Sequence, residues 1–326
     1  PDSKDHGRIH FHDIGDYLSR EEKLSIISDF ESIKGLEEKV GWQEIIPNKH
    51  YDWINQRDQS FENYISLGDK TDKNSNVIFD NYSRGIETGR DAWCYNFSKE
   101  NLMYNMKLMI DHFNSEIEGF TRKKLSNPVL RAEDFVSYDA TKISWTSSLL
   151  PKIERLVKAT FNQDCITLST YRPYSKEWLY YDNMFNHRVG QMRNIFPNQN
   201  AYNKVITLSG IGSKNFSVFM VDKVPCLDMV EKSQCFPLKL YKEMDEIDQG
   251  LFSGQTLVGK YNTKDSITDK AFSFFKASYL DDESITKEDI FYYIYGLLHS
   301  EDYRERYADN LSKQLPRIPC VKKTSD

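Results

Sequence analysis

No cysteine pair in this sequence has the spacing of a metal-binding or redox motif. The five cysteines are scattered, odd in number and form no C-x-x-C: Cys94, Cys165, Cys226, Cys235 and Cys320. This pattern argues against a disulfide framework and against a zinc finger, so we expect reduced thiols. No stretch approaches 18 consecutive apolar residues, and no basic start leads into an apolar segment at the N-terminus. We therefore expect neither a membrane span nor a signal peptide, and a cytoplasmic location.

Enzyme signatures are equally scarce. The sequence contains no G-x-S-x-G, no H-E-x-x-H, no protein-kinase set and neither N-P-P-Y nor D-P-P-Y. Paired carboxylates such as Asp245/Glu246 and Asp281/Asp282 sit in charged stretches, where a solvated surface is the expected role. No catalytic centre is predicted.

What is present is ample material for a folded core. Of 326 residues 39% are hydrophobic, including 20 Tyr and 19 Phe, which excludes a disordered or low-complexity chain. The length fits one large domain or two modest ones. Because the first residue is Pro rather than Met, we expect a piece of a longer protein.

Local patterns in the first half predict mixed secondary structure. Residues 7–14 alternate like a strand, and Ser19 with Glu22 forms a capping box for a helix over 20–34. Residues 77–97 predict two strands around a turn at Arg84 and Gly85. A long helix is expected from Ser98 to about Ile117, followed by a basic loop over 119–131 and a helix that starts near Ser147.

The second half first favours strands and then helices. Strand patterns fill residues 164–241, and helical patterns follow at about 265–279, 286–299 and 300–314. Since strands and helices are segregated, we predict an α+β fold with a central, mainly antiparallel sheet over about 164–241, flanked by helical segments.

Two short motifs invite functional interpretations that we rank low. His10 and His12 lie on one face of the predicted strand and could begin a metal site, but no second cluster of histidines supplies the remaining ligands. Ser209-Gly210-Ile211-Gly212-Ser213-Lys214 resembles a phosphate-binding loop without its full spacing, and a strand pattern follows it rather than a helix. We predict a hairpin turn there.

A locally basic region stands out against the overall charge of −6. Residues 168–215 carry six basic side chains against two acidic ones, interleaved with aromatic and amide residues, and 119–131 carries four basic residues and no acid. Asn and Gln pair with adenine edges and Arg with guanine, so this composition indicates DNA binding. Acidic residues at 243–248 and 281–289 account for the overall sign.

Six ordered strings extend this interpretation. They are HDIGDYLSREEKL (12–24), DWINQRDQSF (52–61), YSRGIETGRDAWCYNFS (82–98), YRPYSKEWLYYD (171–182), SGIGSKNFSVFMVDKVPCLDMVEKSQCFPLKLY (209–241) and DIFYYIYGLLHSEDYRERYADNLSKQLPRIPC (289–320). Together they resemble the C-terminal part of the Type ISP restriction-modification enzymes. The resemblance runs almost end to end.

The resemblance implies a division of labour. Full-length members carry nuclease, helicase-like ATPase, coupler and adenine-N6 methyltransferase parts before a target recognition domain. It implies that residues 1–40 are the trailing strand and helix of the methyltransferase, and that 41–326 form the target recognition domain, with two lobes divided near 160. It implies no cofactor in this chain, while S-adenosylmethionine, ATP and Mg serve the linked domains. Since members usually continue past the PRIP motif at 316–319, we expect a distal segment beyond Asp326.

We therefore predict a sequence-specific double-stranded DNA recognition domain, non-catalytic by itself and covalently linked to methyltransferase, helicase and nuclease domains. The shared strings read as scaffold, so the predicted contacts come from charge and amide content: Arg122, Lys123, Lys124, Arg172, Lys176, Asn186, Arg188, Gln191, Arg193, Asn194, Lys204 and Lys214. Two alternatives stay open. One is a metal-dependent hydrolase that uses His10 and His12. The other is a protein-interaction module of a defence complex that docks through Tyr292, Tyr293, Tyr295 and Tyr307.

Overall fold

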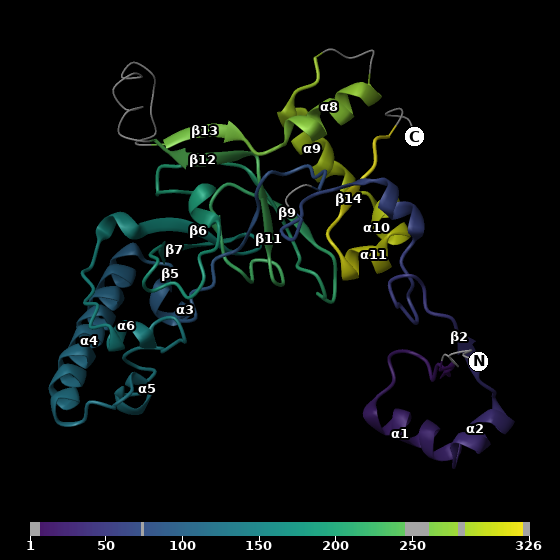
Figure 1. The fold of residues 1–326 in the computed structure, drawn as a ribbon, viewed down its shortest axis with the longest axis horizontal. Coiled ribbons are helices and arrows are strands. Elements are labelled where there is room, and N and C mark those ends of the chain that lie inside the picture. Colours follow the sequence, from purple (N-terminus) through teal and green to yellow (C-terminus); the bar gives the residue numbers. More distant parts are fainter. Residues whose placement is uncertain (1–6, 73–74, 245–260, 280–283, 322–326) are drawn as a thin grey trace, which may run out of the picture. The chain divides into compact units, whose positions relative to one another are not determined.

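A computed structural model describes residues 7–72, 75–244, 261–279 and 284–321 (Figure 1). The chain forms two compact units, Pro1–Asp58 and Gln59–Asp326, each treated by itself below. The predicted acidic pairs Asp245/Glu246 and Asp281/Asp282 lie outside the described residues.

The first unit contains one small sheet and two short helices. Strand β1 (Ile9–Phe11) pairs antiparallel with β2 (Gln43–Ile45), and between them lie α1 (Arg20–Asp29) and α2 (Ile33–Lys39). The capping box is confirmed, because Ser19 Oγ accepts from Glu22 N and Glu22 Oε2 accepts from Ser19 N at 2.7 Å. The helix predicted over 20–34 breaks early, since Glu31 has a positive φ of 61° and Ser32 caps a second helix.

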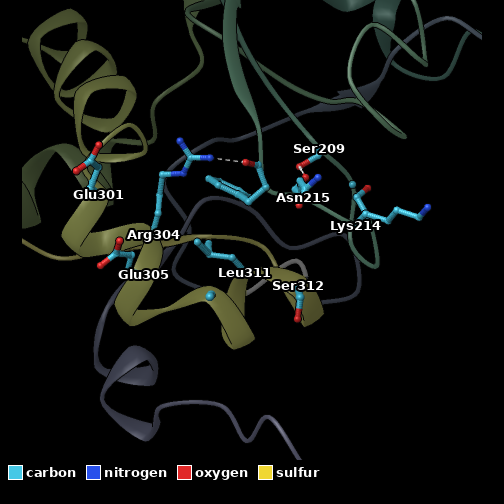
Figure 2. A pocket seen from close by; sticks show the side chains of 12 residues that line it. Ser209, Lys214, Asn215, Glu301, Arg304, Glu305, Leu311 and Ser312 are labelled. Atoms are coloured by element: carbon cyan, nitrogen blue, oxygen red, sulfur yellow. Dashed lines mark hydrogen bonds between the residues drawn. The ribbon is translucent and has the colours of Figure 1, made fainter. Parts of the chain in front are cut away.

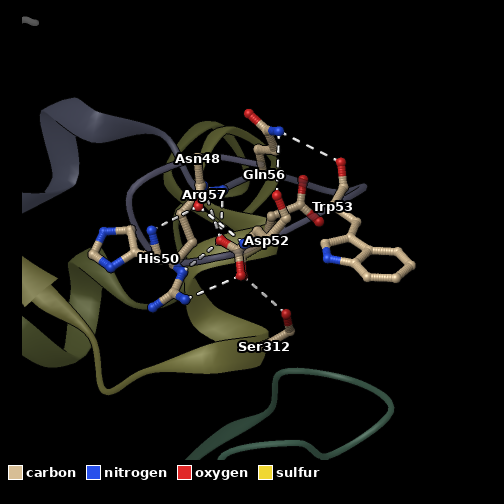
Figure 3. Close-up of polar contacts among 8 residues, drawn as sticks. Asn48, His50, Asp52, Trp53, Gln56, Arg57 and Ser312 are labelled. Carbon is tan, nitrogen blue, oxygen red and sulfur yellow. Dashed lines mark hydrogen bonds and ion pairs between the residues drawn. The ribbon is translucent and has the colours of Figure 1, made fainter. Parts of the chain in front are cut away.

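A polar cluster organises the end of this unit (Figure 3). Asp52 accepts from Arg57 Nε at 2.8 Å, from Arg57 Nη2 at 3.0 Å and from Asn48 Nδ2 at 3.0 Å. The hydrogen bonds from Arg57 hold the pKa of Asp52 far below its usual value. The segment 48–57 is thus irregular in backbone but fixed by charged hydrogen bonds.

The second unit holds the remaining elements. Its strands are β3 (Ile65–Ser66), β4 (Ser83–Arg84), β5 (Tyr95–Asn96), β6 (Ile166–Arg172), β7 (Ser175–Tyr180), β8 (Val205–Leu208), β9 (Val218–Val221), β10 (Val224–Pro225), β11 (Gln234–Pro237), β12 (Lys239–Glu243), β13 (Tyr261–Asp265) and β14 (Arg317–Ile318). Its α-helices are α3 (Asp91–Cys94), α4 (Lys99–Ser126), α5 (Ala132–Phe135), α6 (Leu150–Glu154), α8 (Asp269–Ser278), α9 (Lys287–Leu297), α10 (Glu301–Arg306) and α11 (Ala308–Lys313). Short 3₁₀ helices are η1 (Gln59–Asn63), η2 (Gln163–Cys165) and η3 (Met192–Asn194).

Strands β6 to β11 divide between two four-stranded sheets, and β12 pairs with β13 in a separate two-stranded sheet. The first sheet has the order β10-β6-β7-β5 and the second sheet the order β4-β11-β8-β9. All pairings within them are antiparallel except β10 with β6. The α+β class is therefore confirmed. The predicted central sheet is in fact two four-stranded sheets and one strand of a third, because β4 and β5, from much earlier in the chain, complete different sheets and β12 pairs with β13.

Two hydrophobic cores meet at the second sheet. Along β8, Val205 belongs to one core and Ile206 to the other, and along β11 Cys235 and Phe236 alternate in the same way. Because successive strand residues point to opposite faces, the second sheet is buried on both. Residues before and after position 160 share the first hydrophobic core. The described structure therefore does not divide into two lobes near 160, as we expected.

The helix α4 is longer than predicted. It covers 28 residues and ends at Ser126 rather than near Ile117, since nothing before Asn127 and Pro128 breaks it. Gly119 is accommodated inside the helix, where a Cβ would lie 3.0 Å from the Phe135 ring. Most of the predicted basic loop over 119–131 is therefore helical.

The predicted hairpin over 77–97 is also wrong. β4 pairs with β11, whereas β5 pairs with β7, and α3 lies between them. Gly85, at the predicted turn, instead packs against the Cys226 backbone, where a Cβ would meet the carbonyl oxygen at 2.4 Å. The helix expected from Ser147 is reduced to the five residues of α6.

The start of α4 gives a direct test of one local signal. Ser98 Oγ accepts from Asn101 N at 3.1 Å, which satisfies a backbone donor that the helix itself cannot. We expect Ser98→Ala to lower the free energy of unfolding by about 1 kcal/mol. Urea unfolding followed by circular dichroism measures this, and Ser98→Asp should restore most of the loss. An unchanged midpoint for Ser98→Ala would contradict the assigned cap.

Candidate nucleic-acid interface

Three amide side chains form a cluster at the edge of the second sheet. Gln191 Oε1 accepts from Asn194 Nδ2 at 2.8 Å and from Asn81 Nδ2 at 3.4 Å. We call Asn81, Gln191 and Asn194 the amide cluster. Gln191 and Asn194 are exposed, and within the described part of the chain no hydrogen bond uses Gln191 Nε2. The cluster thus presents amide donors and acceptors to solvent.

Buried neighbours fix this cluster in place. Gln191 N donates to Ser83 Oγ of β4 at 3.0 Å, and the next residue, Met192, is fully buried in the first core. Gly190, with φ of 57°, makes the tight turn that leads into η3. Such preorganisation lowers the entropic cost of binding a ligand.

Arg188 lies at the entrance to the same turn. Its backbone pairs with Glu87, with N–H to O distances of 2.9 and 3.1 Å. Its side chain is 63% exposed and 3.6 Å from Glu87 Oε2. A partly exposed ion pair of this kind is weak, so the guanidinium can exchange Glu87 for another acceptor at small cost.

Two predicted contact residues instead point inward. Asn186 is 2% exposed, its Nδ2 donates to Tyr180 O and its Oδ1 accepts from Asp182 N, both at 3.0 Å. Arg193 donates to Pro197 O at 3.0 Å and to Tyr181 O at 2.6 Å, with its guanidinium 3.7 Å from the Tyr181 ring centre. Both side chains hold the 180–197 loop together, which removes them from the predicted contact set.

Three other predicted cations have partners within the protein. Arg172 lies 4.0 Å from the Tyr171 ring centre and donates to Tyr171 O at 2.8 Å. Lys176 pairs with Asp222 at 3.1 Å. Lys204 donates to Tyr292 Oη, a hydrogen bond that raises the pKa of this lysine, and lies 3.6 Å from Glu288.

The basic residues Arg122, Lys123 and Lys124 lie on the last turns of α4. Cations are favoured there by the helix dipole, and Lys124 also lies 5.0 Å from the Phe120 ring centre. Phe120 contacts Phe135 of α5. In Figure 1 α5 lies far from β12, the strand that η3 contacts. The structure therefore does not bring these residues to the amide cluster.

Lys214 lines a pocket of about 470 Å³ beside α10 and α11 (Figure 2). The segment 209–217 connects β8 to β9, which pair antiparallel, so the predicted hairpin turn is confirmed. Arg304 Nη2 donates to Phe216 O at 2.6 Å, and Glu301 and Glu305 line the same pocket. Lys214 extends away from Arg304 in Figure 2, and the mixed charges do not form a phosphate cradle.

The two alternative sites gain no support in geometry. His10 and His12 pack edgewise against Trp42 and Phe30, with ring centres 6.4 and 5.4 Å apart. Among the residues that the structure describes, no group of three or more His, Cys, Asp or Glu could hold a metal ion.

The tyrosines proposed to dock a neighbouring domain differ in burial: Tyr307 is buried, Tyr293 and Tyr295 are partly buried and Tyr292 is exposed. Tyr307 is buried, with its ring centre 4.8 Å from that of Phe61, and Tyr293 donates to Pro319 O at 2.7 Å. Tyr295 packs against the second core, and Tyr292 contacts Lys204.

No described helix is long and apolar enough to cross a membrane.

Sequence reasoning missed Asn81, which hydrogen-bonds to the predicted Gln191, and the exposed cations Lys70 and Arg84. Asn81 lies beside and Arg84 within the string that begins at Tyr82, which we treated as scaffold, and Lys70 lies in the loop 69–76. It also missed Arg90, whose guanidinium is buried. A polar Asn-x-Ser-Arg run next to the loop 69–76 was the available signal.

Comparisons with known proteins agree on one family. The model of the Type ISP C-terminal specificity domain matches residues 77–326. No curated protein matches. Among solved structures, the ATP-dependent Type ISP restriction-modification enzyme LlaBIII bound to DNA is 32% identical, with a TM-score of 0.80 over 98% of this chain and 19% of that one.

Two further solved structures are similar. A nuclease-deletion mutant of the Type ISP enzyme LlaGI in complex with a DNA substrate mimic is 34% identical, with a TM-score of 0.77 over 98% of this chain and 23% of that one. The DrdV–DNA complex is 29% identical, with a TM-score of 0.78 over 96% of this chain and 29% of that one. The chain thus spans less than a third of each of these proteins.

Proposed function

Because this chain belongs to the Type ISP C-terminal specificity domain family, we propose that it recognises a specific sequence in double-stranded DNA on behalf of a restriction-modification enzyme. The solved relatives are DNA complexes, which supports a duplex as the ligand. The domain is non-catalytic by itself. It holds DNA for adenine-N6 methylation and ATP-dependent restriction by linked domains, which also bind S-adenosylmethionine, ATP and Mg, and it works in the cytoplasm.

The amide cluster is the observation on which our assignment of the base-reading site rests. An exposed amide carries a donor and an acceptor, the pattern that matches the major-groove edge of adenine. Arg188, three residues before Gln191, can supply the fork that matches guanine. Hydrogen bonds to Ser83 and Asn194 hold Gln191 in a defined orientation before DNA arrives.

The experiment that tests this function selects bound duplexes from a random pool, with competitor DNA at stated salt. We expect one preferred sequence. Gln191→Ala should weaken binding to it by about 1–3 kcal/mol and relax the preference at one or two base pairs. The matched control is Gln163→Ala, an exposed glutamine in η2. If Gln191→Ala selected the same sequence with the same affinity, the amide cluster would not be the reading site.

A further inference from the structure

Lys70 and Arg84 are two exposed cations on the outer side of β4 and the loop before it. Lys70 Nζ lies 4.2 Å from the centre of the Tyr82 ring. Arg84 follows Tyr82 by two residues, so it points to the same side of β4 as the ring over which Lys70 lies. Partial burial lowers the pKa of Lys70, Cys235 raises it and the charge of Arg84 lowers it. The two like charges thus lie on one side of β4.

Neither cation has a direct ion-pair partner in the part of the chain that the structure describes. Across the described residues, neither Lys70 nor Arg84 forms an ion pair with Asp or Glu. The neighbouring Asp69 is used locally, because its Oδ1 accepts from Thr71 N and Thr71 Oγ1, each at 2.7 Å, and from Asp72 N at 3.1 Å. Elsewhere on this unit lysines pair with acids, as Lys264 does with Asp80. A fixed pair of cations without an anion is electrostatically suited to receive one.

The protein holds both residues on rigid supports. Tyr82, beneath Lys70, stacks on Phe236 with ring centres 4.8 Å apart and planes at 17°. Gly68 packs on the same ring, where a Cβ would lie 2.7 Å from Tyr82 Cε1. Arg84 is registered opposite Gln234 across the β4–β11 pair. Core packing and strand pairing thus fix the backbone that carries both cations.

The cation pair and the amide cluster lie on opposite sides of one strand. Ser83, adjacent to Arg84 on β4, accepts the backbone hydrogen bond of Gln191. Because successive strand residues point to opposite faces, Ser83 faces the amide cluster while Arg84 points to the other side of the edge strand β4. Phosphates lie beside the base edges that a protein reads, and contacts to them fix register on the duplex.

We propose that Lys70 and Arg84 together bind one backbone phosphate of the target duplex, on the side of β4 opposite the amide cluster, and so help to fix the register of the domain on the DNA. This inference rests on the proposed function. A shared phosphate has a quantitative signature, because removing either cation disrupts the same contact.

The test measures the affinity of the whole chain for its selected duplex and for an unrelated duplex, over a range of salt concentrations. Arg84→Gln and Lys70→Gln should each weaken binding to both duplexes by roughly three- to tenfold. Each should lower the slope of log affinity against log salt by about 1. The double variant should lose less than the product of the two single losses, and Arg84→Lys should keep the parent slope. Arg155→Gln, which removes an exposed charge elsewhere on this unit, should change neither quantity.

Each other outcome has a definite meaning. If the parent binds DNA but the single variants match it in affinity and slope, the phosphate site is wrong while the proposed function stands. If the losses multiply, the cations do not share a phosphate. If Arg84→Gln alters base preference, Arg84 reads a base and our assignment is overturned. If the parent binds no duplex even at low salt, the proposed function fails and this inference with it.

Discussion

Replacing Arg90 with methionine should lower the free energy of unfolding by about 3–5 kcal/mol, among the largest effects of any single change in this protein. Arg90 is 2% exposed. Its Nε donates to Ser144 O at 3.0 Å, Nη1 donates to Thr88 O at 3.1 Å and to Phe185 O, and Nη2 donates to Thr146 Oγ1 at 2.7 Å. Methionine fills part of the volume but leaves these acceptors buried and without a donor.

Equilibrium urea unfolding measures this effect. Arg90→Lys retains the charge but cannot reproduce the planar fork, so it should recover only a minor part of the loss. Arg155→Met, at an exposed position, is the control and should stay within about 0.5 kcal/mol of the parent. A similar small change for Arg90→Met would show that the guanidinium does not tie the three segments together.

Replacing Phe236 with alanine should cost about 3–5 kcal/mol of stability. The side chain is fully buried in the second core, where its ring centre lies 4.8 Å from that of Tyr82 and 5.2 Å from that of Phe79. The cavity would also remove the support under Lys70, so we expect weaker binding to every duplex. Phe236→Leu keeps most of the volume and should lose less than half as much stability.

Two measurements separate these effects. Urea unfolding gives stability, and titration of the selected duplex at a temperature where all variants are folded gives affinity. Phe97→Ala, at a ring that is 75% exposed, should leave stability within about 0.5 kcal/mol of the parent. If Phe236→Ala were destabilised but bound every duplex as tightly as the parent, the link from Phe236 to the cation pair would be refuted.

Local signals in the sequence predicted most elements of this fold correctly. Ser19 and Ser98 cap the expected helices, and each strand pattern in 164–241 contains a strand. These successes share a cause, since caps and alternation act between residues a few positions apart. The α+β class followed from the order of such patterns.

Strand partners could not be predicted in the same way. β4 pairs with β11 some 150 residues later, a contact between distant segments that no local pattern encodes. The end of α4 was also missed, because the basic segment 119–131 was predicted as a loop whereas the helix continues through Gly119 to Ser126.

Amino-acid composition could not predict which polar side chains of the candidate site face solvent. Gln191 and Asn194 share a segment and a chemical character with Asn186 and Arg193, yet the first two face solvent and the others bond to the loop's own carbonyls. Which way a polar side chain turns depends on where the buried residues Phe185 and Met192 anchor the loop. The pairing of Lys70 with Arg84 emerges only when Lys70 is placed over Tyr82, which lies on the same side of β4 as Arg84.

The burial of the second sheet on both faces restricts how new specificities can arise by recombination between relatives. A single crossover in the middle of this region would join β4 of one parent to β8 and β11 of another, and both cores would inherit mismatched side chains. Short exchanges confined to surface turns, such as the turn that carries Gln191, leave the side chains of both cores unchanged. Viable hybrids should therefore carry transplanted loops more often than transplanted halves.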